Sequence, residues 1–146
     1  MKNSYLVSTP IDFKIVIDCV LSTCKESAKE SLVIALTGDL GAGKTTFTQE
    51  LGRRLGVLEQ ITSPTFTIMK QYDISYDGFE KLIHIDAYRI ESVDETKPLH
   101  LDSLFSQPKT IVCVEWPERI HAILPSGAVN ISITIKEGET RQVEVS

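Results

Sequence analysis

One stretch of this sequence combines residue types that bind phosphate. Residues 38–45 read GDLGAGKT and match the pattern G-x-x-x-x-G-K-[ST] at every defined position. Glycines let a backbone turn tightly, so that successive N–H groups can point at phosphate oxygens. The lysine supplies a positive charge for the β- and γ-phosphates, and the threonine hydroxyl is a ligand that Mg²⁺ accepts. The sequence therefore predicts a loop that binds a nucleotide with Mg²⁺.

The residues around this motif favour a phosphate loop over a chance glycine turn. A short apolar strand is predicted over residues 31–37, directly before the motif, and a helix from Lys44 to Leu55, closed by Gly56, directly after it. A helix that begins at the loop presents free N–H groups and the positive end of its dipole to an anion. The residues expected to contact the nucleotide are Gly38, Asp39, Leu40, Gly41, Ala42, Gly43, Lys44, Thr45 and Thr46.

Two acidic residues stand directly after other apolar segments. Asp86 follows the segment LIHI, and Glu115 follows the segment IVCV. A nucleotide-hydrolysing site needs a carboxylate near its metal ion, commonly at the carboxyl end of a neighbouring strand. Each acid is also compatible with an ordinary strand end, but two acids can divide Mg²⁺ binding and orientation of the attacking water. We expect Lys44, Asp86 and Glu115 as catalytic residues and Thr45, Asp86 and Glu115 as metal ligands, with the division between the two acids left open.

Hydrophobic periodicity predicts the elements that position these residues. An amphipathic helix is expected from Pro10 to Cys24, with Thr9 as its N-cap, because apolar residues recur at helical spacing. The expected strands are residues 5–7, 31–37, 66–72, 81–86, 110–115, 129–135 and 142–145, with a turn at 75–78 and helical material over 92–105. The fold class that follows is α/β: a P-loop NTPase-like mixed β-sheet flanked by helices, with an antiparallel C-terminal hairpin, in a single domain over residues 1–146.

Composition excludes several classes of protein. The chain has 146 residues, of which 42% are hydrophobic and 24% are charged, and this apolar content is too high for a disordered chain. Its apolar runs are too short to span a bilayer, and its first residues lack the apolar core of an export signal. A net charge of −5 argues against a protein that coats nucleic acid. The cysteines, Cys19, Cys24 and Cys113, follow no disulfide or zinc spacing. We expect a cytoplasmic protein that binds neither membrane nor DNA.

Three other features have both a functional and a purely structural interpretation. Trp116 directly follows Glu115, and its ring is suited either to stacking on a nucleotide base or to ordinary core packing. His84 lies inside an apolar strand, where we expect a buried histidine satisfied by a hydrogen bond. The hydroxyl residues around Pro64 resemble loops that sense a γ-phosphate, although Ser-Pro sequences are also common in turns.

Four blocks of this sequence together resemble the bacterial TsaE (YjeE) family, the small ATPase of tRNA threonylcarbamoyladenosine (t6A) biosynthesis. The blocks are GDLGAGKTT at residues 38–46, SPTF at 63–66, HIDAYR at 84–89 and VEWPE at 114–118. Their order and spacing are much more specific than the phosphate loop alone. The resemblance implies an ATPase that binds ATP or ADP with Mg²⁺, works with the TsaB and TsaD proteins, and meets tRNA only indirectly.

The resemblance also implies roles for single residues. Trp116 is expected near the nucleotide base. The segment from Thr9 to Asp12, together with Arg141, is expected near its adenine end. Ser63 and Thr65 match the switch-like loop of the family. The residues expected at a partner surface or a phosphate are Tyr88 and Arg89.

Other functions stay open at this level. A phosphate loop alone does not distinguish phosphoryl transfer to water from transfer to an acceptor, so a small-molecule or nucleotide kinase is an alternative, and a nucleotide-sensing subunit without turnover is another. No arginine-rich lid segment is visible in the sequence, which argues against a kinase. No Asn-Lys-x-Asp element follows the loop, which argues against a GTP-driven switch.

Overall fold

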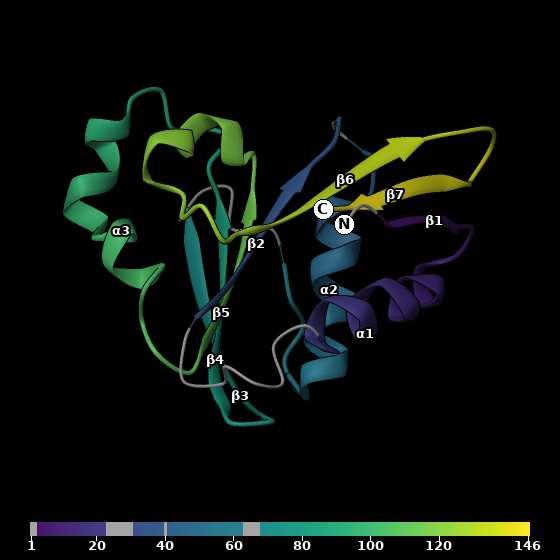
Figure 1. Ribbon diagram of the computed structural model, residues 1–146, viewed down its shortest axis with the longest axis horizontal. Coiled ribbons are helices and arrows are strands. Elements are labelled where there is room, and N and C mark those ends of the chain that lie inside the picture. The colour runs from purple at the N-terminus through teal and green to yellow at the C-terminus, as the bar shows by residue number, and fades with distance from the viewer. Residues whose placement is uncertain (1–2, 23–30, 40, 63–67) are drawn as a thin grey trace.

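A seven-stranded β-sheet forms the centre of the molecule (Figure 1). The structure is a computed structural model that describes residues 3–22, 31–39, 41–62 and 68–146. The strand order is β1-β7-β6-β2-β5-β4-β3. The strands are β1 (Asn3–Val7), β2 (Leu32–Thr37), β3 (Met69–Tyr76), β4 (Phe79–Asp86), β5 (Thr110–Glu115), β6 (Val129–Ile135) and β7 (Arg141–Val145).

The four central strands run parallel, and antiparallel strands flank them on both sides. β2 pairs in parallel with β5 and with β6, and β4 pairs in parallel with β5. β6 and β7 form the antiparallel hairpin that the sequence predicts. Two further antiparallel pairings, β1 with β7 and β3 with β4, complete the sheet. The prediction of a mixed sheet with an antiparallel C-terminal hairpin is confirmed.

Helical segments cover both faces of this sheet. The α-helices are α1 (Phe13–Ser22), α2 (Lys44–Leu55) and α3 (Leu101–Leu104), and the 3-10 segments are η1 (Pro10–Asp12), η2 (Val93–Leu99) and η3 (Pro117–Ile123). α1 and α2 lie together on one side of the sheet, and α3 lies on the other with η2 and η3 (Figure 1). Within the described ranges, none of these helices is long and apolar enough to cross a bilayer.

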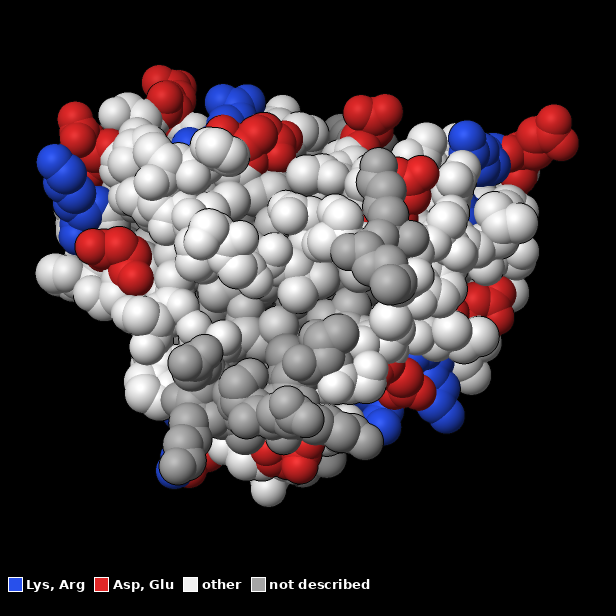
Figure 2. Space-filling view, in the orientation of Figure 1, with Lys and Arg blue, Asp and Glu red and all other residues white. Residues whose placement is uncertain are grey.

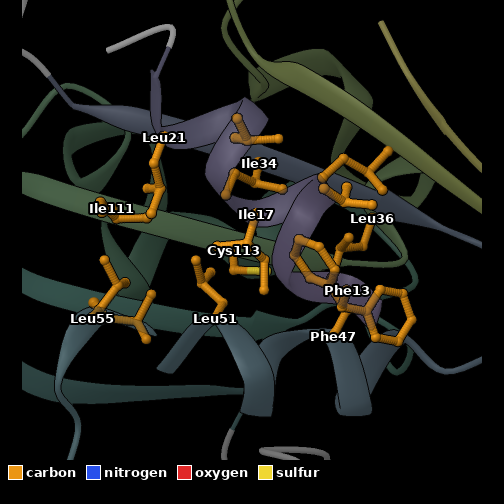
Figure 3. Packing of buried hydrophobic residues seen from close by; sticks show 14 of the residues in the cluster. Phe13, Ile17, Leu21, Ile34, Leu36, Phe47, Leu51, Leu55, Ile111 and Cys113 are labelled. Carbon is orange, nitrogen blue, oxygen red and sulfur yellow. The ribbon is translucent and has the colours of Figure 1, made fainter. Parts of the chain in front are cut away.

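The larger hydrophobic cluster holds α2, and with it the glycine-rich loop, against the sheet. Phe13 and Ile17 of α1 pack with Phe47 and Leu51 of α2 over the strands (Figure 3). The rings of Phe13 and Phe47 meet edge to face, with their centroids 5.6 Å apart. Burying a side chain of this size stabilises the fold by roughly 1.5–3 kcal/mol. The start of α2 is therefore fixed by the core rather than by the loop itself.

The first helix differs from the prediction at its start. Thr9 is an N-cap with a capping box, as expected, but it caps η1, and the α-helix begins only at Phe13. The Asp12 carboxylate accepts the backbone N–H groups of Ser8 and Thr9 at 3.0 and 2.9 Å, which stabilises this tight first turn. Cys24, where the predicted apolar stripe ends, lies outside the described residues.

The strand expected over residues 66–72 corresponds to β3, which begins at Met69, while residues 66 and 67 lie outside the described residues. It continues to Tyr76, so the turn to β4 is confined to Asp77 and Gly78. Both turn residues have left-handed backbones, with φ of 48° and 92°, as a two-residue hairpin turn requires. The expected turn at 75–78 contains both of these residues but begins two residues too early.

The polar segment over residues 92–105 is helical, as expected, but mostly as a 3-10 segment. Pro98 has no N–H to donate to a continuing α-helix. His100 has a left-handed backbone with φ of 53°, which ends η2 and leaves only the single turn of α3.

Candidate functional site

The glycine-rich loop between β2 and α2 has a backbone that only glycine allows at its two ends. A Cβ atom on Gly38 would lie 2.7 Å from the carbonyl oxygen of Ile133, so a larger residue does not fit there. Gly43 precedes α2 with φ of 111°, a conformation that other residues rarely adopt. Between them, Ala42 donates its backbone N–H to the Asp39 carbonyl oxygen at 3.0 Å. The loop therefore turns tightly in front of the N-terminus of α2, where an anion is favoured.

Lys44, the first residue of α2, is buried and points back along the loop. Its Nζ atom donates a hydrogen bond to the Gly38 carbonyl oxygen at 2.7 Å and lies 3.6 Å from the centroid of the Trp116 ring. Burial lowers the pKa of Lys44, and four nearby carboxylates, of which Glu115 has the largest effect, oppose this shift only in part. A desolvated ammonium group at the loop is well placed to pair with a phosphate.

Trp116 lies beside the loop lysine. It follows β5 with a left-handed backbone (φ 58°, ψ 50°), which is uncommon for a residue other than glycine. The Tyr88 ring lies against it, with centroids 5.0 Å apart, and the Arg119 guanidinium lies 5.9 Å from the Tyr88 ring. The cation–π contact with Lys44 holds the ring beside the loop lysine, and the position of Trp116 relative to a nucleotide base stays a prediction.

Glu115 and Asp86 end adjacent parallel strands at the same edge of the sheet as the loop. In the strand register, Leu36 of β2 lies beside Glu115, and Glu115 lies beside Asp86. Both acids are buried, with exposed fractions of 3% and 6%. Oε1 of Glu115 lies 3.4 Å from the Thr45 hydroxyl, whereas Oδ1 of Asp86 accepts the backbone N–H of Tyr88 at 3.0 Å. The loop threonine therefore faces Glu115.

A buried histidine belongs to the same group of side chains. His84 lies on β4, and its Nε2 atom is 2.5 Å from Oε2 of Glu115. The expectation of a buried, hydrogen-bonded His84 is confirmed, and its partner is Glu115, which was not among the predicted contacts. The sequence nevertheless contained a signal for this contact. His84 precedes Asp86 by two residues, so both side chains lie on one face of β4. The neighbouring parallel strand, β5, also ends in an acid.

A cavity of about 140 Å³ lies on the other side of the loop. Thr9, Phe13, Thr46 and Arg141 are among the residues that line it. Arg141 also donates a hydrogen bond from Nε to the Ala42 carbonyl oxygen at 3.0 Å, which ties β7 to the loop. A ligand whose phosphates lie on the loop can extend into this cavity, so the placement of Thr46 and Arg141 fits their predicted roles.

Asp12 does not line this cavity. Its carboxylate accepts the backbone N–H groups of Thr9 and Ser8, and these bonds lower the pKa of Asp12. Ser8 and Thr9 themselves form part of the cavity wall. Asp12 therefore shapes the wall through Ser8 and Thr9, and a direct contact of Asp12 with the nucleotide stays a prediction.

The other predicted site residues fall into two groups. Asp39, Gly41, Tyr88 and Arg89 are exposed at the surface. The predicted residues that lie outside the described ranges are Leu40, Ser63 and Thr65.

The chain is similar to proteins of one family. Residues 17–143 match the family described as threonylcarbamoyl adenosine biosynthesis protein TsaE. Over 116 residues the chain is 41% identical to the tRNA threonylcarbamoyladenosine biosynthesis protein TsaE of Bacillus subtilis, which covers 80% of this chain and 70% of that protein. Over 119 residues it is 37% identical to the protein of the same name from Treponema pallidum, covering 81% of this chain and 84% of that one.

A solved structure extends the comparison to the fold. The crystal structure of YdiB from Bacillus subtilis is 30% identical in sequence and matches with a TM-score of 0.67, covering 99% of this chain and 84% of that one. Its likeness supports the assignment of the mixed sheet and glycine-rich loop to a P-loop NTPase fold. The chain therefore belongs to the TsaE family of tRNA threonylcarbamoyladenosine biosynthesis.

Proposed function

We propose that this chain binds ATP and Mg²⁺ at residues 38–46 and hydrolyses ATP to ADP and phosphate in the cytoplasm. In this proposal its ATP cycle supports t6A formation on tRNA by the TsaB–TsaD complex. The observation that carries the proposal is the convergence of Lys44, Thr45 and Glu115 at the end of a glycine-rich loop, in front of a helix N-terminus.

Phosphate binding is supported by the loop lysine. Lys44 is nearly buried, and the only hydrogen bond described for its Nζ atom is to the Gly38 carbonyl oxygen. Phosphate oxygens offer this ammonium group a charge-assisted partner, and the N-terminus of α2 adds unpaired N–H groups at the same place. As negative charge shifts toward the bridging oxygen during hydrolysis, Lys44 is placed to stabilise it.

The donor groups beside the loop fit Mg²⁺. Thr45 and Glu115 both offer hard oxygen ligands, and their oxygens are 3.4 Å apart. This separation is long for a hydroxyl–carboxylate hydrogen bond but near the ~3 Å between neighbouring ligands of an octahedral Mg²⁺ ion. Among the described residues, no three His, Cys, Asp or Glu side chains form a metal site by themselves, so phosphate oxygens and water would complete the shell. When bound, Mg²⁺ supplies positive charge to the phosphate oxygens.

The two acids receive different roles in this proposal. Glu115 is assigned to the metal, because it faces Thr45 directly. Asp86 is assigned to orientation of the attacking water, because it lies at the same edge one strand further from the loop. Its burial supports this assignment, since water held by a buried carboxylate is shielded from bulk solvent.

Surface features support a role with protein partners rather than with tRNA alone. Tyr88 is 45% exposed and lies in contact with Trp116, so a partner that touches Tyr88 can influence the loop. On the face shown in Figure 2, acidic and basic side chains are interspersed, mostly around the outline. With a net charge of −5 as well, the proposal leaves tRNA recognition to TsaB and TsaD.

The test compares ATP hydrolysis by the purified chain with and without TsaB–TsaD. We expect slow hydrolysis alone, and multiple rounds of t6A formation only when the chain is present. Lys44→Ala should abolish ATP binding, followed by the fluorescence of Trp116, the single tryptophan, and should also abolish repeated t6A formation. Lys97→Ala removes a largely exposed lysine and serves as the matched control. Normal t6A formation with Lys44→Ala, or phosphoryl transfer to a small acceptor instead of water, would contradict the proposal.

A further inference from the structure

Within the described part of the chain, the buried His84 ring makes a single polar contact, and that contact is with the proposed metal ligand. The exposed fraction of His84 is 0%, and its Nε2 atom lies 2.5 Å from Oε2 of Glu115. The other ring nitrogen, Nδ1, is also buried and has no hydrogen-bond partner within the described part of the chain. An unpaired buried polar atom costs free energy, so a hydrophobic residue would serve the core better unless the contact with Glu115 has a use.

The strand register directs this ring at Glu115. His84 and Asp86 are two residues apart on β4 and so share one face of the sheet. The parallel register places Cys113 beside His84, and Glu115 beside Asp86. Thr48 of α2 closes over this face, with its hydroxyl 3.5 Å from the Cys113 sulfur. The ring is therefore held by backbone pairing and by α2, in a place that water does not reach.

The surroundings of the two ring nitrogens determine where a single ring proton lies. With the proton on Nε2, the ring donates a charge-assisted hydrogen bond to the Glu115 carboxylate. With the proton on Nδ1, a buried N–H would lack an acceptor, and the lone pairs of Nε2 and Oε2 would face each other at 2.5 Å. The first arrangement makes His84 the hydrogen-bond donor and Glu115 the acceptor.

We propose that His84 is a positioning residue that orients the Glu115 carboxylate for Mg²⁺. The inference rests on the function proposed above. His84 engages Oε2 of Glu115, which leaves Oε1 toward Thr45 at 3.4 Å, so one hydrogen bond selects the oxygen that meets the metal. Without it, the carboxylate is free to rotate and one of its buried oxygens has lost its donor. Removing a hydrogen-bonding partner of a metal ligand typically weakens metal binding by about 10- to 100-fold.

Two amide substitutions at position 84 test this inference. In His84→Gln, the side-chain amide nitrogen can reach about as far as Nε2 and can still donate to Glu115. In His84→Asn, the same amide is one methylene shorter and falls short of Glu115. The probe is Mn²⁺ in place of Mg²⁺, titrated into protein that is in excess over ADP, with free Mn²⁺ followed by electron paramagnetic resonance. ADP affinity in EDTA is measured separately by calorimetry.

We expect His84→Asn to weaken Mn²⁺ binding by about 10- to 100-fold while ADP affinity in EDTA stays at the wild-type value. His84→Gln should restore Mn²⁺ affinity most of the way. Thr110→Val is the structural control, because it removes a buried hydrogen bond at the opposite end of β5 and should leave Mn²⁺ affinity unchanged. If the wild-type protein binds neither ADP nor Mn²⁺, the proposed function fails. If the wild type binds both and His84→Asn binds Mn²⁺ equally well, only the inference about His84 fails.

A measurement on the wild-type protein does not depend on how the variants fold. The chain has three histidines, and His100 and His121 are exposed, so the buried ring of His84 can be recognised in ¹H–¹⁵N spectra of the imidazole groups. We expect its proton on Nε2, with a ¹⁵N shift that changes when Mg²⁺ is added to the ADP complex. A proton on Nδ1, or a ring ¹⁵N shift that stays the same when Mg²⁺ is added, would overturn the inference.

Discussion

The carboxyl ends of β4 and β5 look equivalent along the backbone but differ in what their side chains contact. Asp86 and Glu115 stand side by side in the parallel register, and both are buried. Glu115 contacts Thr45 of the loop through one oxygen and His84 through the other. Asp86 instead accepts the N–H of Tyr88, two residues further along its own chain. Equal register therefore does not give equal contacts.

Two physical differences separate these strand ends. β5 is the direct neighbour of β2, which leads into the loop, whereas β4 lies one strand further away, by about 4.8 Å. Glutamate is also one methylene longer than aspartate, so its carboxylate reaches away from its own backbone, while an aspartate readily bonds the N–H two residues on. The longer acid on the nearer strand is the one that meets the loop.

The largest effect is expected for Glu115→Gln. The amide keeps the size of the side chain but removes the negative charge that strengthens metal binding, so hydrolysis should fall by about 10³-fold and Mn²⁺ affinity should fall with it. Single-turnover phosphate release and the Mn²⁺ titration measure the two losses, with ADP affinity in EDTA as the control. Hydrolysis within a few-fold of wild type would remove Glu115 from the site.

A smaller effect, on hydrolysis but not on metal affinity, is expected for Asp86→Asn. The amide oxygen can still accept the Tyr88 N–H, so the turn after β4 is kept, but a weaker base orients the water. We expect hydrolysis to fall by about 10²-fold with Mn²⁺ affinity unchanged. The same two assays apply. If Asp86→Asn loses Mn²⁺ binding and Glu115→Gln does not, the roles of the two strand ends are exchanged.

A modest gain in stability is expected for Lys44→Met, which removes the cation that both acids face. Burial lowers the pKa of Lys44, so its charged form is less favourable in the folded than in the unfolded protein. This cost is fully present at pH values below the folded pKa and fades as the pH rises from there to the ordinary lysine value of 10.5. Thermal unfolding should therefore show a higher midpoint for Lys44→Met at pH 7 and a smaller difference at pH 10.

The exposed Lys97→Met is the control for that experiment, and its midpoint should stay at the wild-type value at both pH values. A lower midpoint for Lys44→Met at pH 7 would show that the contacts of Lys44 with Gly38 and Trp116 stabilise the fold more than desolvation of the charge destabilises it.

The smallest effect is expected for chemical modification of Cys113, which lies inside β5 two residues before Glu115. Burial raises the pKa of Cys113 to about 12, so almost no thiolate forms at pH 8. We expect iodoacetamide to leave Cys113 unmodified in the folded protein and to modify it in denaturant, as read by peptide mass spectrometry. Cys19, which is only partly buried, provides the comparison. Modification of Cys113 in the folded protein as fast as Cys19 would contradict a closed interior.

Local features of the site were predictable because neighbouring residues produce them. The helix from Lys44 to Leu55 has the expected bounds, since the motif before it and the left-handed Gly56 after it are both visible in the sequence. Apolar runs of four to six residues likewise mark the buried parallel strands. The break between η1 and α1 was not predicted, because a capping box and Pro10 are compatible with either helix type.

Contacts between residues that are distant in the sequence were less predictable from it. The partner of His84 depends on which strand lies next to β4, and the position of Trp116 depends on a left-handed backbone that no neighbouring residue requires. The Asp12 carboxylate closes the turn before α1 by accepting the N–H groups of Ser8 and Thr9. In each case the sequence allows several partners for the side chain, and tertiary packing determines which of them lies within contact distance.

The sequence by itself determined that this chain has a phosphate loop between a buried strand and a helix, with acids ending two other strands, because motif and periodicity are local properties. Only the tertiary structure decided that Glu115 rather than Asp86 faces Thr45, and that His84 holds its other oxygen. The reason is the strand order, which sets β5 between β2 and β4 and so places one acid next to the loop and the other a full strand spacing away.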